Sequence, residues 1–232
     1  MSASDWISFW DSRHSVYVNR RHLEAHYRRI ADDLLRYVPQ GGAVLDYGCG
    51  EALSHGRIAE RASRLLLCDA APGVRAGLAS RFADNRKIAV HSPDEVAALP
   101  AASLDRIVMH SVAQYLGAEQ LDERLALFRR LLRGDGMLVL GDIIPPGVSP
   151  VPDALSLLRF GAREGFFFAA GLGLVRTLFS NYARLRSTLG LAHYDEAAIT
   201  ARLAAAGFSA ERAAQNAGHN PARMTFLARP RG

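Results

Sequence analysis

The chain has 232 residues, which is enough for one sizeable α/β domain with an added element. Hydrophobic residues make up 49% and charged residues 22%, so the chain can bury a core and broad disorder is not expected. The net charge of +5 comes from arginines scattered among acidic residues, with Lys87 as the only lysine and no basic run. That distribution disfavours a nucleic-acid partner.

Neither cysteine belongs to a metal-binding or disulfide pattern. Cys49 and Cys68 form no CxxC pair and have no histidine at metal-ligand spacing, so we predict no bound metal and a cytoplasmic location. The first residues, with acidic Asp5 and Asp11, lack the basic flank and apolar run of a secretory signal. The most apolar stretch, 166–182, contains Arg176 and polar breaks, so no transmembrane segment is expected.

The first expected element is an amphipathic helix over residues 13–38, because apolar residues recur there at steps of three and four. Short apolar runs and helical patterns then alternate, which predicts a parallel sheet flanked by helices. The expected strands cover 43–46, 64–68, 88–90, 104–109 and 137–140, and the expected helices cover 58–62, 74–82 and 121–132.

Beyond the fifth strand, four prolines between 145 and 152 break regular structure. A mostly helical insert follows, with more large apolar residues than one face of a surface helix requires. Asp195 is a candidate N-cap for a last helix that ends before Gly207. Residues 208–214 and 224–228 are expected to form an antiparallel hairpin with a short polar turn.

The clearest chemical motif is an apolar strand that ends in a carboxylate and a Gly-x-Gly turn, residues 44–50 (VLDYGCG). Gly48 and Gly50 let the backbone approach a ligand closely, because no Cβ intervenes. In open α/β sheets, ligands bind beyond the carboxyl ends of the strands, which is where this turn lies. The motif therefore predicts a site for a nucleotide-like cofactor.

Two phosphate-binding alternatives do not fit this turn. A dinucleotide fingerprint needs a third small residue where this chain has Leu53, and a P-loop needs a Lys-Ser/Thr pair that is absent. Asp69 ends the second strand, where a carboxylate can accept hydrogen bonds from both ribose hydroxyls of an adenosine. A lone aspartate there is more often a turn or cap residue, but its pairing with the 44–50 motif favours the cofactor site.

In the order and spacing of its motifs, the chain resembles the class I S-adenosylmethionine-dependent methyltransferases, most closely their small-molecule branch. The resemblance covers residues 40–142, and a weaker resemblance extends over residues 195–230. The matching segments are 44–50 (VLDYGCG), 67–72 (LCDAAP), 104–112 (LDRIVMHSV) and 132–139 (LRGDGMLV).

The resemblance implies S-adenosylmethionine as the cofactor and assigns the motifs to its parts. It places Asp46, Gly48 and Gly50 at the methionine part and Asp69 at the ribose. The other implied contacts are Ala70 beside the adenine, Pro93 and Asp94 at the adenine amine, and His110, Ser111 and Val112 near the sulfonium.

Two positions depart from the family pattern. Ala52 stands where the family often has a third glycine, and its small side chain is expected to be tolerated. Asp94 follows the third strand only after three intervening residues, whereas the family often has an aspartate directly after that strand. The second departure weakens the implied adenine contact.

Methyl transfer from a sulfonium mainly requires orientation and exclusion of water, because the donor is already activated. A base is needed only where the acceptor must lose a proton. The catalytic candidates are His110, with Tyr115 nearby, and Asp142; packing or cofactor binding for His110 and turn capping for Asp142 stay open as alternatives. His14, Tyr17 and His22 are candidates to close over the cofactor, with structural roles as the alternative.

The acceptor is expected to be a small apolar or aromatic molecule, because the apolar insert lies where relatives build a substrate lid. Two alternatives stay open for the insert's surface, a homodimer contact and a membrane-surface contact. A nucleic-acid acceptor is not expected, since the segment 110–113 (HSVA) lacks the Asn/Asp-Pro-Pro-aromatic motif of many amino methyltransferases.

These inferences combine into one predicted α/β domain. It has a Rossmann-like, mostly parallel sheet of seven strands with an antiparallel edge hairpin, helices on both faces and a helical insert after the fifth strand. Its expected parts are an N-terminal helical cap (1–40), a cofactor-binding core (41–144), the insert (145–192) and a C-terminal helix with edge strands (193–232). The alternative to an enzyme is a non-catalytic binding or assembly module that retains the fold.

Overall fold

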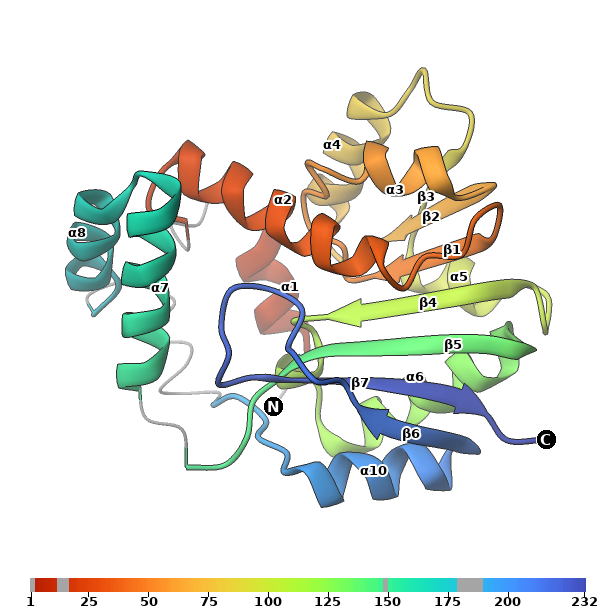
Figure 1. Ribbon diagram of the computed structural model, residues 1–232. Coiled ribbons are helices and arrows are strands. Elements are labelled where there is room, and N and C mark those ends of the chain that lie inside the picture. Colours follow the sequence, from red (N-terminus) through yellow and green to blue (C-terminus); the bar gives the residue numbers. More distant parts are fainter. Residues whose placement is uncertain (1–2, 12–16, 148–149, 179–189) are drawn as a thin grey trace.

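A computed structural model of the chain describes residues 3–11, 17–147, 150–178 and 190–232. Its centre is a seven-stranded sheet in the order β3-β2-β1-β4-β5-β7-β6 (Figure 1). Strands β1 to β5 pair in parallel with one another, whereas β7 is antiparallel to both β5 and β6. The strands are β1 (Ala43–Tyr47), β2 (Arg64–Cys68), β3 (Ile88–His91), β4 (Leu104–His110), β5 (Leu132–Ile143), β6 (Phe208–Arg212) and β7 (Met224–Pro230). The predicted sheet, including its antiparallel edge, is confirmed.

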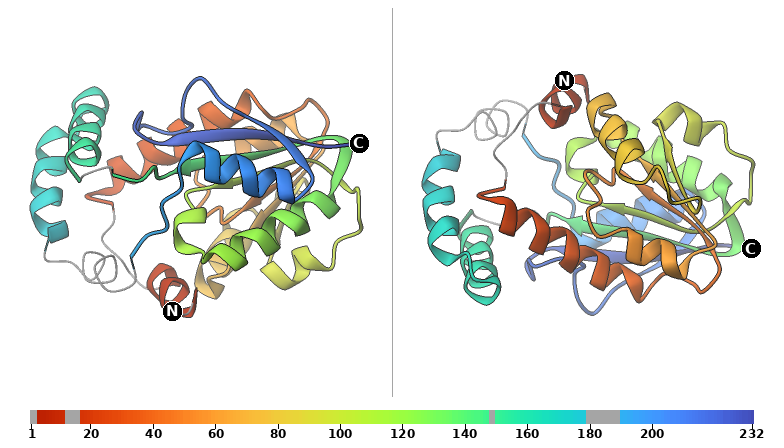
Figure 2. Two further views of the ribbon diagram at one scale, coloured as in Figure 1. Left: turned by 90° about the horizontal axis from the view of Figure 1, so that it is seen from below. Right: turned by 90° about the horizontal axis from the view of Figure 1, so that it is seen from above.

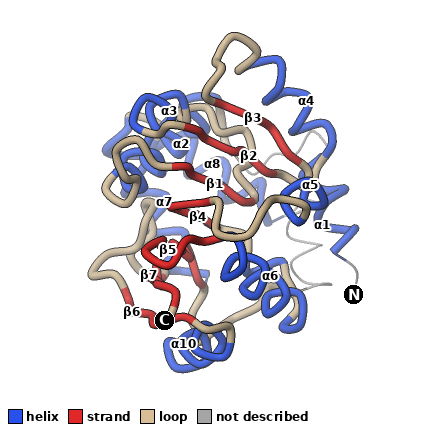
Figure 3. The backbone as a smooth tube through the Cα atoms, turned by 90° about the vertical axis from the view of Figure 1, so that its right-hand side faces the viewer, coloured by secondary structure: helices blue, strands red, loops and turns tan. Residues whose placement is uncertain are grey.

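Helices cover both faces of this sheet, with α2 and α3 on one side and α6 on the other (Figure 3). Successive side chains of a strand point to opposite faces, so each strand contributes to two cores. In β1, Val44 packs with α2 and α3, whereas Leu45 packs with α6. The helices are α1 (Ala3–Asp11), α2 (Arg20–Leu35), α3 (Gly56–Arg61), α4 (Pro72–Arg81), α5 (Pro93–Ala97), α6 (Ala118–Leu131), α7 (Pro150–Glu164), α8 (Phe167–Leu178) and α10 (Glu196–Ala205).

Side-chain caps explain where several helices begin. Asn19 accepts a hydrogen bond from the His22 N–H at 2.8 Å, so α2 starts at Arg20 and not at residue 13 as the periodicity predicts. Asp195 caps α10 in the same way, as predicted. Ser92 forms a capping box with Glu95, and this starts the short helix α5, which the sequence prediction treated as a turn.

The C-terminal hairpin forms as predicted, but its connection is not a short turn. Residues 213–223 leave β6 and fold back toward the carboxyl ends of the central strands before β7 begins. The Gly218 N–H donates to Asp33 on α2, and Ser156 on α7 donates to the His219 carbonyl. The connection therefore ties together three elements that are distant in sequence.

The described part of the apolar insert contains two helices, α7 and α8, which stand beside the sheet and pack on α2 (Figure 2). Phe160, Phe166 and Ala170 are buried against Ala25 of α2. The outer surface carries exposed apolar side chains: Val151, Leu155, Phe167, Phe168 and Leu172. None of the described helices is both long and apolar enough to cross a membrane.

Lys87 joins the start of β3 to the end of α3. Its Nζ donates to the carbonyl oxygens of Ala59, Glu60 and Ala62, at 3.2, 3.3 and 3.0 Å. These carbonyls lie at a helix C-terminus, where they carry partial negative charge and lack helical partners. The ammonium group is therefore placed where a cation is favourable.

Candidate cofactor and active site

The glycine turn after β1 and the aspartate after β2 meet as predicted. Gly48 and Gly50 have φ angles of 79° and 56°, which place both in the left-handed region that glycine adopts without strain. This conformation aims the Gly50 N–H at Asp69 Oδ2, at 3.0 Å, while Asp69 Oδ1 accepts from the Ala71 N–H at 2.9 Å. The Asp69 carboxylate is thereby fixed in orientation, and burial raises its pKa.

The remaining residues implied at the adenine lie at the same edge. Arg75 donates to the backbone carbonyls of Asp69 and Ala70, both at 2.8 Å, which holds this turn. β3 pairs with β2 so that His91 lies opposite Cys68. Pro93 and Asp94 therefore begin α5 one strand away from Asp69, as the first residues of a helix.

Asp46 has a partner that the sequence did not reveal. Its Oδ2 lies 2.5 Å from Nε2 of His55, and both side chains are buried. His55 Nδ1 has no hydrogen-bond partner among the described residues. Nothing in the sequence singles out His55, since it stands between a loop and a short helix with no motif around it.

Side chains from two other elements close against the glycine turn. A Cβ on Gly48 would overlap Val112 after β4, and a Cβ on Gly50 would overlap the Tyr27 hydroxyl of α2. The Tyr27 hydroxyl also accepts a hydrogen bond from the Glu51 N–H at 2.8 Å. The two glycines are thus required by packing within the chain, independently of any ligand.

A second polar group lies at the ends of β4 and β5. Ser111 Oγ donates to Asp142 Oδ2 at 2.8 Å and lies 3.0 Å from His110 Nδ1, and His110 Nε2 lies 2.9 Å from the Ala217 carbonyl. His110 is buried, whereas Ser111 and Asp142 are half-buried. The structure therefore brings together two of the three predicted catalytic candidates and joins them through Ser111.

Residues of the 213–223 connection hold this polar group in place. Asn216 Nδ2 donates to Asp142 Oδ1 at 3.4 Å, and Asn216 Oδ1 accepts from the Asp142 N–H at 3.3 Å and from Thr225 Oγ1 at 2.8 Å. Asn216 is a further candidate site residue that the sequence prediction missed. Its contacts join positions 74 residues apart, and no local motif marks them.

The third catalytic candidate, Tyr115, lies elsewhere. Its ring packs against Trp6 and Trp10 of α1, with ring centroids 4.6 and 5.8 Å apart. Tyr115 therefore belongs to an aromatic contact with the N-terminal helix.

A continuous cluster of aromatic and imidazole rings connects α2, the α7–α8 pair and the 213–223 connection. His22 stacks on Phe166 at 4.9 Å and His219 stacks on Phe160 at 4.8 Å. Burial lowers the pKa of His22 to about 4 and lowers the pKa values of His26 and His219, so these rings are neutral at pH 7. The ring cluster comprises Tyr17, His22, His26, Tyr27, Phe160, Phe166 and His219. His14, another predicted closing residue, lies outside the described residues.

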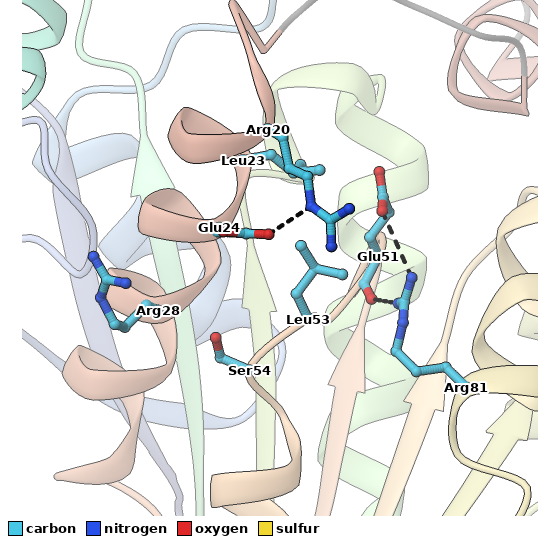
Figure 4. Close-up of a pocket in the computed structure, with 8 residues that line it drawn as sticks. All are labelled: Arg20, Leu23, Glu24, Arg28, Glu51, Leu53, Ser54 and Arg81. Carbon is cyan, nitrogen blue, oxygen red and sulfur yellow. Dashed lines mark hydrogen bonds and ion pairs between the residues drawn. The ribbon is translucent and has the colours of Figure 1, made fainter. Parts of the chain in front are cut away.

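Outside the glycine turn, α2, the loop after β1 and α4 surround a cavity of about 550 Å³ (Figure 4). Two ion pairs lie in its lining, between Arg20 and Glu24 of α2 and between Arg81 of α4 and Glu51. Arg81 also donates to the Glu51 carbonyl. This lining is mainly charged, so the cavity does not have the apolar character expected for the acceptor pocket.

The fold and the position of the site define the chain as a protein with the class I methyltransferase fold. Residues 45–140 match the family model described as a methyltransferase domain. The search of curated proteins found no match to this chain. The predicted resemblance to the S-adenosylmethionine-dependent methyltransferases is thereby confirmed.

Three solved structures illustrate this similarity of fold. The DhpI–SAH complex is 12% identical with a TM-score of 0.63, and the match covers 99% of this chain and 97% of that one. N-methyltransferase NodS from Bradyrhizobium japonicum WM9, with S-adenosyl-L-homocysteine, is 18% identical with a TM-score of 0.59, over 100% and 99% of the chains. Magnesium protoporphyrin IX methyltransferase (ChlM) from Synechocystis PCC 6803, with bound SAH, is 15% identical with a TM-score of 0.60, over 99% and 94%.

Proposed function

We propose that the chain is an S-adenosylmethionine-dependent methyltransferase that acts on a small molecule. The observation that carries this proposal is the geometry of Asp69. Backbone N–H groups of Gly50 and Ala71 orient its two carboxylate oxygens at the carboxyl end of β2. Each oxygen keeps a lone pair for one hydroxyl of a ribose diol, and hydrogen bonds to a charged group contribute roughly 1.5–3 kcal/mol each.

The electrostatics of this edge also suit the cofactor. Asp46 lies near the end of β1 and Asp69 directly follows β2, and these two strands pair residue by residue. S-adenosylmethionine carries a positive sulfonium and a positive α-ammonium group, and nearby carboxylates stabilise both charges. The thiols of Cys49 and Cys68 add no negative charge there, because burial raises the pKa of each well above its usual range.

The bound cofactor would supply the activated methyl group, and the chain would supply orientation and exclusion of water. Val112 and Tyr27 close against the glycine turn and would shield the methionine part. His110, Ser111 and Asp142 would contact the acceptor; the support is that Val112 adjoins Ser111 in the chain and Gly48 in space. Pro93, Asp94 and Ala70 would border the adenine.

The small apolar or aromatic nature of the acceptor rests on the ring cluster beside this site. Neutral histidine, tyrosine and phenylalanine rings offer flat apolar surfaces with polar edges. The charged cavity at Glu51 and Arg81 offers a much less suitable surface for such a molecule. We therefore propose that the acceptor binds beside this ring cluster and that α7 and α8, which pack on α2, act as a lid.

A non-catalytic module with the same fold is the second candidate. The observation in its favour is that Gly48 and Gly50 have a packing reason within the chain, since Val112 and Tyr27 occupy the space beside them. A module without a cofactor would keep these glycines. The Asp69 carboxylate also bonds within the chain, to Gly50 and Ala71, so cofactor binding decides between the two candidates.

Calorimetric titration with S-adenosylmethionine and S-adenosylhomocysteine separates the two candidates. We expect micromolar binding, weakened at least about 100-fold in Asp69→Ala because two charge-assisted hydrogen bonds are lost. Asp84→Ala is the matched control, since Asp84 is an exposed turn residue of the same charge. Absence of binding by the folded wild type would establish the non-catalytic module instead.

A further inference from the structure

Three polar contacts in series join the ends of β4 and β5. They run from the Ala217 carbonyl to His110 Nε2, from His110 Nδ1 to Ser111 Oγ, and from Ser111 Oγ to Asp142 Oδ2, at 2.9, 3.0 and 2.8 Å. Each contact has the length of a hydrogen bond and needs one hydrogen between its two atoms. The series therefore needs three hydrogens.

The resting charge states of these groups supply only two. The Ala217 carbonyl can only accept, so the nitrogen that faces it carries the single hydrogen of a neutral His110 ring. Ser111 has one hydroxyl hydrogen for its two contacts, and an ionised Asp142 has none. The series becomes complete when one additional proton resides on the imidazole or on the carboxylate.

The backbone fixes the members of this series in place. Ser111 and Asp142 have φ angles of 57° and 62°, in the left-handed region that non-glycine residues seldom adopt and that often marks functional sites. The His110 ring lies against Gly141, where an added Cβ would come within 2.7 Å of the ring. The contacts therefore follow from the fold of the two strand ends and do not depend on a mobile side chain.

The titratable groups that face His110 do not oppose an additional positive charge on its ring. His26 of α2 and His219 of the 213–223 connection face His110, and burial lowers the pKa of both, so neither is charged at pH 7. Asp142 is the facing anion from β5. The other ionised groups near the connection are paired, Asp33 with Arg29 and Arg36 and Asp153 with Arg223.

We propose that His110, Ser111 and Asp142 form one proton-binding unit that accepts the proton of a hydroxyl-type methyl acceptor. This inference rests on the proposed methyltransferase function and narrows its substrate class. In the transfer, a bond forms between the acceptor oxygen and the methyl carbon, and the sulfur–methyl bond breaks with its electrons left on sulfur. The proton of the acceptor moves to the Asp142 carboxylate and is shared with His110 through the Ser111 hydroxyl. A carboxylate acceptor has no proton to lose and makes no use of this unit.

The test measures proton binding directly and needs no identified acceptor. NMR of the full chain with nitrogen-15-labelled histidine follows the hydrogens on both His110 nitrogens between about pH 5 and pH 9. We expect His110 to lose its second hydrogen at a pH at least about one unit lower in Asp142→Asn than in the wild type, because the facing charge is removed. The amide of the new side chain also supplies the third hydrogen of the series.

Two further variants make the result specific. Ser111→Ala interrupts the series without changing charge and is expected to produce at least half of the same shift. Asp84→Asn removes a carboxylate from an exposed turn and is expected to shift the His110 titration by less than about 0.2 unit. Coincident titrations of wild type and Asp142→Asn, or of wild type and Ser111→Ala, would overturn the proposal.

The same samples separate this proposal from the proposed function. Calorimetry with S-adenosylhomocysteine reports on the Asp69 edge, which the Asp142→Asn change does not touch. Cofactor binding with coincident His110 titrations would overturn the proton-binding unit and leave the methyltransferase intact. Shifted titrations without any cofactor binding would retain the unit and contradict the methyltransferase.

Discussion

The two halves of the site are assembled over very different distances along the chain. In the β1–β2 half, Asp69 bonds to Gly50 and Ala71, which are 19 and 2 residues away. In the β4–β5 half, His110 contacts a residue 107 positions away, and Asp142 contacts Asn216, 74 positions away. The first half can form as soon as two neighbouring strands pair, whereas the second needs the C-terminal hairpin in place. The proposed cofactor site is thus formed by residues that are close in sequence, whereas the proposed proton chemistry depends on the completed sheet.

The largest effect on stability is expected from Gly48→Ala in the β1–β2 half, called the local half below; the β4–β5 half is called the distant half. The left-handed φ of 79° costs an alanine about 1–2 kcal/mol, and overlap with Val112 adds about 1–3 kcal/mol. We expect a total loss of about 3 kcal/mol in the free energy of unfolding, measured in urea. Gly77→Ala is the control, since Gly77 lies exposed in α4 with open space around it, and it should gain about 0.5–1 kcal/mol. A loss below about 1 kcal/mol at Gly48 would mean that the local half is easily deformed.

The next effect concerns pH and the ring cluster that adjoins the distant half. The folded pKa of His22 is about 4 against 6.5 for the free side chain, so the unfolded chain takes up this proton first as the pH falls. Stability is therefore lost from pH 6.5 downward, and this histidine accounts for about 2 kcal/mol of the loss at pH 5.

The measurement compares urea unfolding at pH 7.5 and at pH 5 in the wild type and in His22→Phe, which keeps an aromatic ring on Phe166. The variant should lose about 2 kcal/mol less than the wild type between the two pH values. His193→Phe changes an exposed histidine and should leave the pH dependence as it is. Parallel behaviour of wild type and His22→Phe would contradict a buried, neutral His22.

A smaller effect is expected from Asn216→Ala, which breaks the distant half without touching the local half. Loss of the contacts to Asp142 and Thr225 should cost about 1–2 kcal/mol of stability. Asn85→Ala removes one bond in an exposed turn and should cost less than about 0.5 kcal/mol. If Asn216→Ala also weakens S-adenosylhomocysteine binding about tenfold, the two halves of the site are coupled. The β1–β2 half would then not be independent of the C-terminal hairpin.

The smallest effect is expected outside both halves, on the outer face of α8. Phe168 is 89% exposed, so Phe168→Ser should change the free energy of unfolding by less than about 0.5 kcal/mol. Phe166→Ala is the buried counterpart and should cost about 3 kcal/mol, because its ring fills the contact with α2. A large effect at Phe168 would show that this face has a partner in solution.

The same contrast decides how much could be predicted from the sequence. The strands β1 to β5 were predicted because each is a short apolar run between helical patterns, and Asp69 because it ends such a run. Asp195 was predicted as a cap from its position before a helical pattern. All of these signals are local.

The missed features have causes that are not local. The Asp46–His55 pair needs the loop after β1 to fold back under its own strand. The long 213–223 connection reads as a polar turn because its partners on α2, β5 and α7 are far away in sequence. α5 was missed for a different reason, since a five-residue helix gives too few apolar positions to show a period.

Lys87 is the single site in this chain for chemical modification of a lysine side chain. As the only lysine, it concentrates all lysine-directed modification at one ammonium group, which binds three carbonyls at the end of α3. Acylation there would remove both the positive charge and two of the three hydrogens it can donate. Because the Lys87 side chain is exposed, a lysine-directed reagent can reach it in the folded chain, and acylation would replace its contacts with the carbonyls at the end of α3.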